Sequence, residues 1–235
     1  MVREAIILAG GFGTRLSSVV EDVPKPMAPV LGKPFLHYLF QQLAQADITR
    51  VILAIHHKRE AITKYFGNHY LGIDVEYSIE EQALGTGGGI RQALTKCEGN
   101  EALVLNGDSL IDLDLILFMA KFNESKKPMS MALRYMDDVA RYGAVEAEDN
   151  VLTAFKEKGE KKGSGYINSG VYLIRRKYFL ENTPQGNFSM ETEFLEPTSK
   201  LGVIHTFPSN DYFIDIGIPS DYERAQDEFK RFENR

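Results

Sequence analysis

The chain has 235 residues, 43% of them hydrophobic and 26% charged, a composition that is ordinary for a folded globular protein. Its net charge of −6 argues against a general nucleic-acid surface, because binding to a phosphate backbone depends on summed basic charge. The single cysteine, Cys97, excludes an internal disulfide, and no apolar run approaches the roughly 20 residues of a membrane span. The sequence shows no cationic leader that is followed by a long apolar region. It therefore predicts a cytoplasmic protein that binds no membrane.

Strand and helix patterns alternate in the first half of the chain. Continuous apolar runs predict buried strands at 5–8, 51–55 and 102–105, and a further strand is predicted at 75–78. Helical spacing of apolar residues predicts helices at 34–46, 60–66 and 88–94. Apolar strands separated by helices are typical of a parallel sheet that is covered on both faces. The sequence therefore predicts a doubly wound, Rossmann-like α/β fold.

The pattern becomes mixed after about residue 110. Strands are predicted at 129–135, 143–148, 151–155, 166–174 and 203–207, some of them antiparallel, and a helix is predicted at 222–232. No internal repeat, no Ser/Pro-rich linker and no hexapeptide repeat of a β-helix tail occurs. We therefore expect one domain, 1–235, with a mixed sheet and no β-helix tail.

A glycine-rich segment, LAGGFGTRL at 8–16, follows the first predicted strand. Backbone N–H groups in such a turn can form a concave anion site. Arg15 and Lys25 add two positive charges, and a nucleoside triphosphate is a ligand that needs both features. A dinucleotide fingerprint would have a third glycine where Leu16 stands, so a nicotinamide-dependent enzyme is disfavoured.

Two aspartates lie in apolar surroundings. Asp108 follows the apolar run 103–105 and falls at a strand end, where doubly wound sheets bind ligands. Asp215 lies within the apolar segment 213–219, where a carboxylate must be paired or bound to a metal. Carboxylates are ligands that Mg²⁺ prefers. By contrast, four aspartates without such context are expected to be solvated turn residues: Asp112, Asp114, Asp137 and Asp138.

The segment GFGTRL at 11–16, followed by PKPM at 24–27, resembles the signature of the sugar-1-phosphate nucleotidyltransferases. The resemblance extends from residue 4 to about residue 225. It implies that a sugar 1-phosphate attacks the α-phosphorus of a nucleoside triphosphate, which gives a nucleotide sugar and pyrophosphate. In such an enzyme Arg15 would hold the departing pyrophosphate and Lys25 would contact the α-phosphate. A sugar phosphate is already anionic at neutral pH, so no general base is expected.

The same resemblance implies roles for further residues. Asp108 and Asp215 would hold Mg²⁺, with the nucleotide in the half 1–110 and the sugar phosphate in the half 111–235. The implied sugar-phosphate contacts are Gly143, Glu157, Lys158 and Asn168. A segment at Met190 and Glu191 also resembles the family. The implied nucleotide contacts are Leu8, Ala9, Gly10, Gly11, Gly13, Thr14, Glu80, Gly85, Thr86, Gly87 and Asn106.

Within the family, the short chain and the segment FIDIGIPSDY at 213–222 look most like the D-glycero-D-manno-heptose 1-phosphate guanylyltransferases. This resemblance favours GTP and a heptose 1-phosphate as substrates. Mannose-1-phosphate guanylyltransferases and cytidylyl-, uridylyl- or thymidylyltransferases stay open as alternatives. A non-catalytic nucleotide-sensing subunit is a remote alternative, because the phosphate-binding cations and both aspartates are present. A homodimer is also left open.

Overall fold

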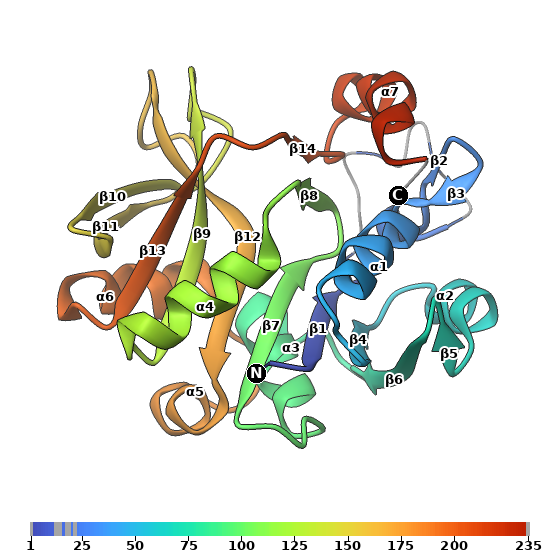
Figure 1. Ribbon diagram of the computed structural model, residues 1–235, viewed down its shortest axis with the longest axis horizontal. Coiled ribbons are helices and arrows are strands. Elements are labelled where there is room, and N and C mark those ends of the chain that lie inside the picture. The colour runs from blue at the N-terminus through green and yellow to red at the C-terminus, as the bar shows by residue number, and fades with distance from the viewer. Residues whose placement is uncertain (1, 12–15, 17–19, 21–22, 234–235) are drawn as a thin grey trace.

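A parallel sheet formed by the first half of the chain is the centre of the fold (Figure 1). The structure is a computed structural model, and it describes residues 2–11, 16, 20 and 23–233. The parallel strands lie in the order β7-β1-β4-β6, with Ile7 of β1 opposite Leu53 of β4 and Leu105 of β7. Their bounds are β1 (Glu4–Leu8), β4 (Arg50–Ile55), β6 (Ile73–Ile79) and β7 (Glu101–Asn106). All four correspond to predicted strands.

Helices cover both faces of this parallel sheet. On one face α1 (Phe35–Gln45) and α2 (Arg59–Phe66) pack with the strand residues that include Ile7. On the other face α3 (Gly85–Leu94) packs with those that include Ile6. Neighbouring residues of one strand thus enter opposite layers, as the pleat of a strand requires. The doubly wound fold predicted from the sequence is confirmed.

The second half of the chain extends the same sheet. Within the described residues ten strands form it, in the order β10-β11-β13-β9-β12-β7-β1-β4-β6-β5, and β12 joins β7 antiparallel. The strands added by the second half are β9 (Met129–Met136), β10 (Ala144–Glu148), β11 (Val151–Lys156), β12 (Gly165–Arg175) and β13 (Ile204–Ser209), and at the other end of the sheet β5 (His69–Tyr70) of the first half pairs with β6. Two short pairs stand apart: β2 (Pro29–Val30) with β3 (Lys33–Pro34), and β8 (Ser109–Ile111) with β14 (Phe213–Asp215). The mixed sheet is also confirmed.

The helix α4 (Leu115–Ser125) of the second half was not predicted, and neither was α5 (Arg176–Asn182). The N-cap of α4 is Asp114, which is exposed as expected but also accepts a hydrogen bond from the backbone N–H of Leu117 at 2.9 Å. Such a cap satisfies one of the unpaired N–H groups of the first turn. The remaining helices and turns are α6 (Glu196–Thr198), the 3₁₀ turns η1 (Lys25–Met27) and η3 (Ser199–Leu201), and the π-helical η2 (Glu191–Leu195).

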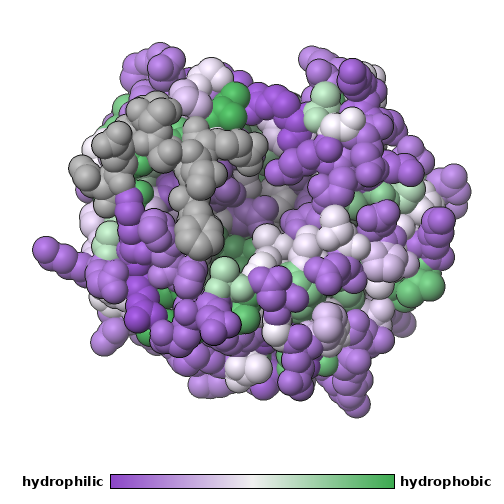
Figure 2. Space-filling model, turned by 180° about the vertical axis from the view of Figure 1, so that it is seen from behind, coloured by the Kyte–Doolittle hydropathy of each residue, from purple (hydrophilic) through white to green (hydrophobic). Residues whose placement is uncertain are grey.

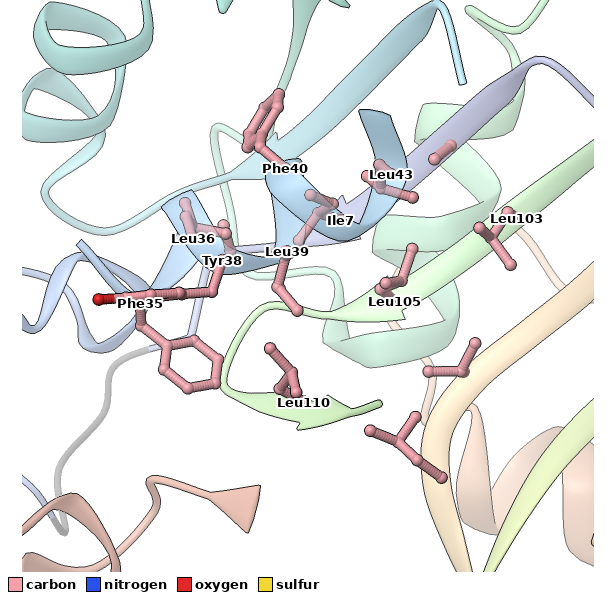
Figure 3. Packing of buried hydrophobic residues seen from close by; sticks show 14 of the residues in the cluster. Ile7, Phe35, Leu36, Tyr38, Leu39, Phe40, Leu43, Leu103, Leu105 and Leu110 are labelled. Atoms are coloured by element: carbon pink, nitrogen blue, oxygen red, sulfur yellow. The ribbon is translucent and has the colours of Figure 1, made fainter. Parts of the chain in front are cut away.

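The core on the α1 side is built from large apolar residues of that helix. Phe35, Leu39 and Leu43 are buried with Ile7 and Leu105 of the strands, as the close view in Figure 3 shows. Burial of a side chain of this size stabilises a fold by about 1.5–3 kcal/mol. No described helix is both long enough and apolar enough to cross a membrane.

The C-terminal helix returns to this core. α7 (Pro219–Glu228) begins three residues before the predicted 222–232, with Pro219 in its first turn, and η4 (Phe229–Phe232) continues it. The stripe predicted on one side of the helix is buried: Tyr222, Ala225, Phe229 and Phe232. The ring of Phe229 meets that of Tyr38 edge to face at 4.6 Å between centroids. This contact anchors the end of the described chain on α1.

Candidate active site

A cavity of about 520 Å³ lies beyond the carboxyl ends of β1 and β7. These neighbouring strands are the point where the order of the parallel sheet reverses, and such a point is where open α/β sheets bind ligands. Leu8 at the end of β1 and Asn106 at the end of β7 both line the cavity. Figure 2 shows hydrophilic side chains gathered around a hollow on the rear face of the molecule.

Three charged residues meet in this cavity. The Lys25 Nζ lies 2.6 Å from Asp108 Oδ2 and 3.2 Å from Asp215 Oδ1. The Lys25 side chain is only 9% exposed. Burial alone would lower the pKa of Lys25, but the two carboxylates outweigh it and raise that pKa above its ordinary value. Lys25 is therefore positively charged at neutral pH, and it shares its charge between two acids.

Each member of this charged cluster comes from a different part of the chain. Lys25 is the first residue of η1, which Pro24 precedes in an extended conformation. Asp108 follows β7, and Asp215 ends β14, where it pairs with Ser109 of β8. The backbone N–H of Gly217 donates to Asp215 Oδ1 at 2.7 Å, which fixes the carboxylate. Asp108 and Asp215 thus both contact the Lys25 ammonium, and their role as metal ligands stays a prediction.

The two carboxylates form a donor set for a cation. Within the described part of the chain no group of three or more Asp, Glu, His or Cys side chains is arranged as a metal site. Mg²⁺, however, is usually held by one or two carboxylates together with substrate phosphates and water. Asp108 and Asp215 already face one shared cation, the Lys25 ammonium, so their chemistry fits a magnesium ion that arrives with a triphosphate.

The N-terminus of α3 forms a second wall of the cavity, through Gly85 and Thr86. Gly85 has a φ of +70°, and a Cβ there would lie 2.5 Å from the carbonyl oxygen of Phe188. The N–H groups of Gly87 and Gly88 donate to the same oxygen at 3.0 and 3.3 Å. These contacts explain why the helix begins three residues before the predicted start at Gly88: tertiary hydrogen bonds outweigh the poor helix propensity of glycine.

Glu80 follows β6 and is a buried acidic residue that lines the cavity. Its Oε2 accepts a hydrogen bond from the N–H of Leu84 at 3.0 Å, in the turn that leads into α3. Burial raises the pKa of Glu80, and this outweighs the opposing effects of the Leu84 N–H group and of His56. The hydrogen bond from Leu84 thus holds the carboxyl group in place, while burial destabilises its charged form.

The predicted sugar-phosphate residues also line the cavity: Gly143, Glu157, Lys158 and Asn168. The amide of Asn168 is oriented by two contacts, since its Oδ1 accepts from the N–H of Gly170 at 3.0 Å and its Nδ2 donates to the Tyr172 hydroxyl at 2.6 Å. Glu157 and Lys158 lie between β11 and β12, on a charged loop. The structure therefore places all four candidates around one space.

Some predicted contacts lie elsewhere. Ala9 is buried and its N–H donates to the carbonyl of Ala54, and Gly87 is buried against the Phe188 ring, so neither lines the cavity. Gly13, Thr14 and Arg15 fall outside the described residues. The other predicted contacts line the cavity together with the four sugar-phosphate candidates. They are Leu8, Gly10, Gly11, Lys25, Glu80, Gly85, Thr86, Asn106, Asp108 and Asp215.

Several lining residues were not singled out from the sequence. Tyr142 and Phe213 form an aromatic contact at 5.8 Å, and Phe155 lies beneath Gly143. Tyr142 and Phe213 stand next to or near predicted residues, so proximity in the chain could have indicated them. Asn187 carries no such signal, because only the folding of its segment onto the turn before α3, where its Nδ2 donates to Ala83, brings it to the cavity.

The chain is similar to proteins of known name and to solved structures. D-glycero-alpha-D-manno-heptose 1-phosphate guanylyltransferase of Aneurinibacillus thermoaerophilus is 44% identical over 97% of this chain and 99% of its own length. The protein of the same name from Campylobacter jejuni is 47% identical over 93% of this chain and 96% of its own length. The crystal structure of HddC from Yersinia pseudotuberculosis complexed with GMP-PN has a TM-score of 0.85 and 38% identity, over 97% of this chain and 100% of that chain. Residues 4–231 match the Nucleotidyl transferase family, and the chain therefore belongs to that family.

Proposed function

We propose that the protein transfers GMP from GTP to D-glycero-D-manno-heptose 1-phosphate, which yields a GDP-heptose and pyrophosphate. Two relatives at 44% and 47% identity, each matched over more than nine tenths of this chain, carry this guanylyltransferase name. The observation that carries the proposal is the cluster of Lys25, Asp108 and Asp215 at the switch point of the sheet, because phosphoryl chemistry is accelerated by fixed charges there.

In the proposed reaction an oxygen of the sugar phosphate attacks the α-phosphorus of GTP in line. A new bond forms between that oxygen and the α-phosphorus, the bond to the β-phosphate oxygen breaks, and pyrophosphate leaves with the bonding electron pair. Lys25 stabilises the negative charge that develops at the α-phosphate, and Arg15 is proposed to hold the pyrophosphate. The sugar phosphate needs no protein base because it is already an anion.

Asp108 and Asp215 are proposed to hold Mg²⁺, which when bound supplies charge neutralisation for phosphate oxygens. Removal of the metal by a chelator is then expected to stop turnover. The Lys25 ammonium is free to turn from the two carboxylates toward a phosphate once a second cation balances them. Positioning and electrostatics, rather than covalent catalysis, account for the rate.

The two halves of the chain are proposed to divide the substrates. Residues 1–110 supply the nucleotide side, with Glu80 facing the base and Gly85 and Thr86 facing the nucleoside. A carboxylate in the position of Glu80 suits guanine, whose N1–H and amino group are adjacent donors. Residues 111–235 supply the sugar side, with Gly143, Glu157, Lys158 and Asn168 around the sugar phosphate.

The proposal is tested by measuring pyrophosphate release with each nucleoside triphosphate and a panel of sugar 1-phosphates. GTP with the heptose 1-phosphate is expected to give the highest kcat/KM, and mass spectrometry is expected to identify a GDP-heptose. Turnover with CTP, UTP or dTTP but not with GTP would contradict the guanylyl assignment. Preference for mannose 1-phosphate over the heptose would contradict the acceptor assignment alone.

A further inference from the structure

Glu191 is the first residue of the π-helical turn η2, and its side chain lines the cavity. Its Oε2 accepts hydrogen bonds from Thr86 Oγ1 at 2.7 Å and from Ser189 Oγ at 3.0 Å. No hydrogen bond links Oε1 to another side chain or backbone group in the described part of the chain. One oxygen thus anchors the carboxylate while the other is available in a cavity. π-helical turns of this kind occur frequently at functional sites.

The surroundings of Glu191 connect the two sides of the cavity. Thr86 belongs to the first turn of α3, on the nucleotide side, and its Oγ1 also accepts from the N–H of Met190 at 2.8 Å. On the sugar side is Tyr172, whose hydroxyl accepts from Asn168. Burial first, and then the charge of Glu191, raises the pKa of Tyr172. Glu191 lines the same cavity as Asn168, and both belong to the half of the chain, 111–235, that is proposed to hold the sugar.

We propose that Glu191 is a specificity-determining residue that accepts a hydrogen bond from a ring hydroxyl of the sugar 1-phosphate through Oε1. This inference rests on the proposed function, because it assigns a role within the acceptor side of the same cavity. A carboxylate is an acceptor only, so it recognises a hydroxyl donor, and a bond with one charged partner is stronger than a neutral one. The anchored Oε2 holds the acceptor in one orientation before the sugar binds.

A purely structural role for Glu191 makes a different prediction. In that case the carboxylate would only brace Thr86 and the N-terminus of α3, where a negative charge is favourable. Glu191→Gln keeps an oxygen that can accept from Thr86 and Ser189, so these supporting hydrogen bonds would be retained. It replaces the second acceptor with an amide N–H₂, which cannot accept from a hydroxyl. The substitution therefore separates support of α3 from recognition of the sugar.

The control is Glu193→Gln, on the same turn. Glu193 is exposed, accepts from the N–H of Ser189 at 2.7 Å and does not line the cavity. It is thus matched to Glu191 in residue type, element and hydrogen bonding to residue 189. We expect Glu193→Gln to leave both Michaelis constants within about twofold of wild type.

The experiment measures steady-state kinetics of wild type, Glu191→Gln and Glu193→Gln with GTP and the best acceptor, and then with monodeoxy analogues of that acceptor. Glu191→Gln is expected to raise the KM of the sugar 1-phosphate about 10- to 100-fold, the range of a lost hydrogen bond to a charged group, and to leave the KM of GTP unchanged. For the analogue that lacks the contacted hydroxyl, wild type and the variant are expected to differ by less than about threefold.

Three results would overturn the inference. The first is an unchanged acceptor KM in a folded Glu191→Gln protein. The second is an equal effect of the substitution on every deoxy analogue. The third is a loss of discrimination between GTP and its 2′- or 3′-deoxy forms, which would assign Glu191 to the ribose. Failure of the proposed function is distinguishable, since the wild-type protein would then turn over no pair of GTP and sugar 1-phosphate.

Discussion

At the scale of single residues, the main feature of the site is that two negatively charged side chains contact one positively charged side chain. Two carboxylates, Asp108 and Asp215, share the single ammonium group of Lys25. The Lys25 side chain is nearly buried and the carboxylates are partly exposed, so the unbalanced negative charge faces the cavity. A further cation is favoured there by Coulomb attraction in a site of reduced dielectric constant. This imbalance is the physical reason to expect a metal ion with the triphosphate.

The three residues of the cluster were predictable because each carries a local signal. Lys25 lies in a Pro-Lys-Pro-Met segment, Asp108 follows an apolar run, and Asp215 lies within one. The anchoring of Glu191 by Thr86 was not predictable, because it depends on contact between residues 105 positions apart. Sequence patterns indicate which residues are chemically exceptional, whereas such pairings depend on how the elements pack.

The first prediction concerns Glu80, whose pKa is raised by burial above its ordinary value of 4.5. A raised pKa means that ionising this carboxyl opposes folding as the pH rises from the unfolded value through the folded one. Glu80→Gln should therefore unfold at higher temperature than wild type at about pH 7. The difference should disappear well below pH 4.5, where Glu80 is protonated in both states, as thermal melts across pH can show.

The same substitution tests recognition of the base. Glu80→Gln is expected to lower kcat/KM for GTP roughly 10- to 100-fold, in line with loss of hydrogen bonds to a charged acceptor. Wild type should also prefer GTP over ITP, which lacks the amino group, and the variant should not. Retention of the full preference for GTP by Glu80→Gln would show that Glu80 only supports the turn before α3.

At the scale of secondary structure elements, α3 depends on the segment that covers it. Gly87 packs so tightly that an added Cβ would lie 2.1 Å from a carbon of the Phe188 ring. Gly87→Ala is expected to displace Phe188 and to destabilise the fold by about 1–3 kcal/mol, the usual cost of overpacking. Chemical denaturation measures this change. Gly11→Ala is the control, because a Cβ there meets no atom of the described residues within 4 Å.

A second prediction at this scale concerns the start of α4. Asp114→Ala removes the side chain that accepts from the Leu117 N–H group and should cost about 1 kcal/mol of unfolding free energy. The control is Asp137→Ala, since Asp137 is exposed and no described contact involves its side chain. Equal stability of the two variants in urea would show that the cap contributes nothing.

Elements with a regular apolar pattern were predicted well, and others were not. The strands β1, β4 and β7 were predicted because each contains a continuous apolar run, a pattern that is typical of buried strands. The helix α4 was missed although Asp114 precedes a run with Leu115, Phe118, Met119 and Phe122 at helical spacing, because Ile116 and Leu117 on its outer side are apolar and exposed and blur that spacing. The start of α3 was misplaced because its glycines are fixed by contacts with Phe188 rather than by their own propensity.

At the scale of the whole molecule, one sheet joins the two halves. β7 of the first half pairs with β12 of the second, so the two halves that are proposed to hold the nucleotide and the sugar share one continuous sheet. The C-terminal α7 follows directly after the Asp215 segment and packs its end against α1. The cytoplasmic location and the homodimer stay predictions from the sequence.

Phe229 tests this long-range connection. Its ring is fully buried between Phe35 and Tyr38 of α1. Phe229→Ala is expected to cost about 3–5 kcal/mol through lost burial and the cavity left behind. Urea denaturation should show this loss as one cooperative transition. A separate early transition confined to the C-terminal helix would contradict the view that α7 and the core unfold together.

The central claim is that guanylyl transfer takes place at the cluster of Lys25, Asp108 and Asp215. Its most direct test is ³¹P NMR of GTP, Mg²⁺ and heptose 1-phosphate with wild type, Asp108→Asn and Asp215→Asn, each first shown to be folded by its melting transition. Each variant leaves Lys25 one carboxylate partner, so the fold should persist. Wild type should form a nucleotide sugar and pyrophosphate, and each variant should be slower by about 10²- to 10³-fold. A rate near that of wild type in either folded variant would contradict the account.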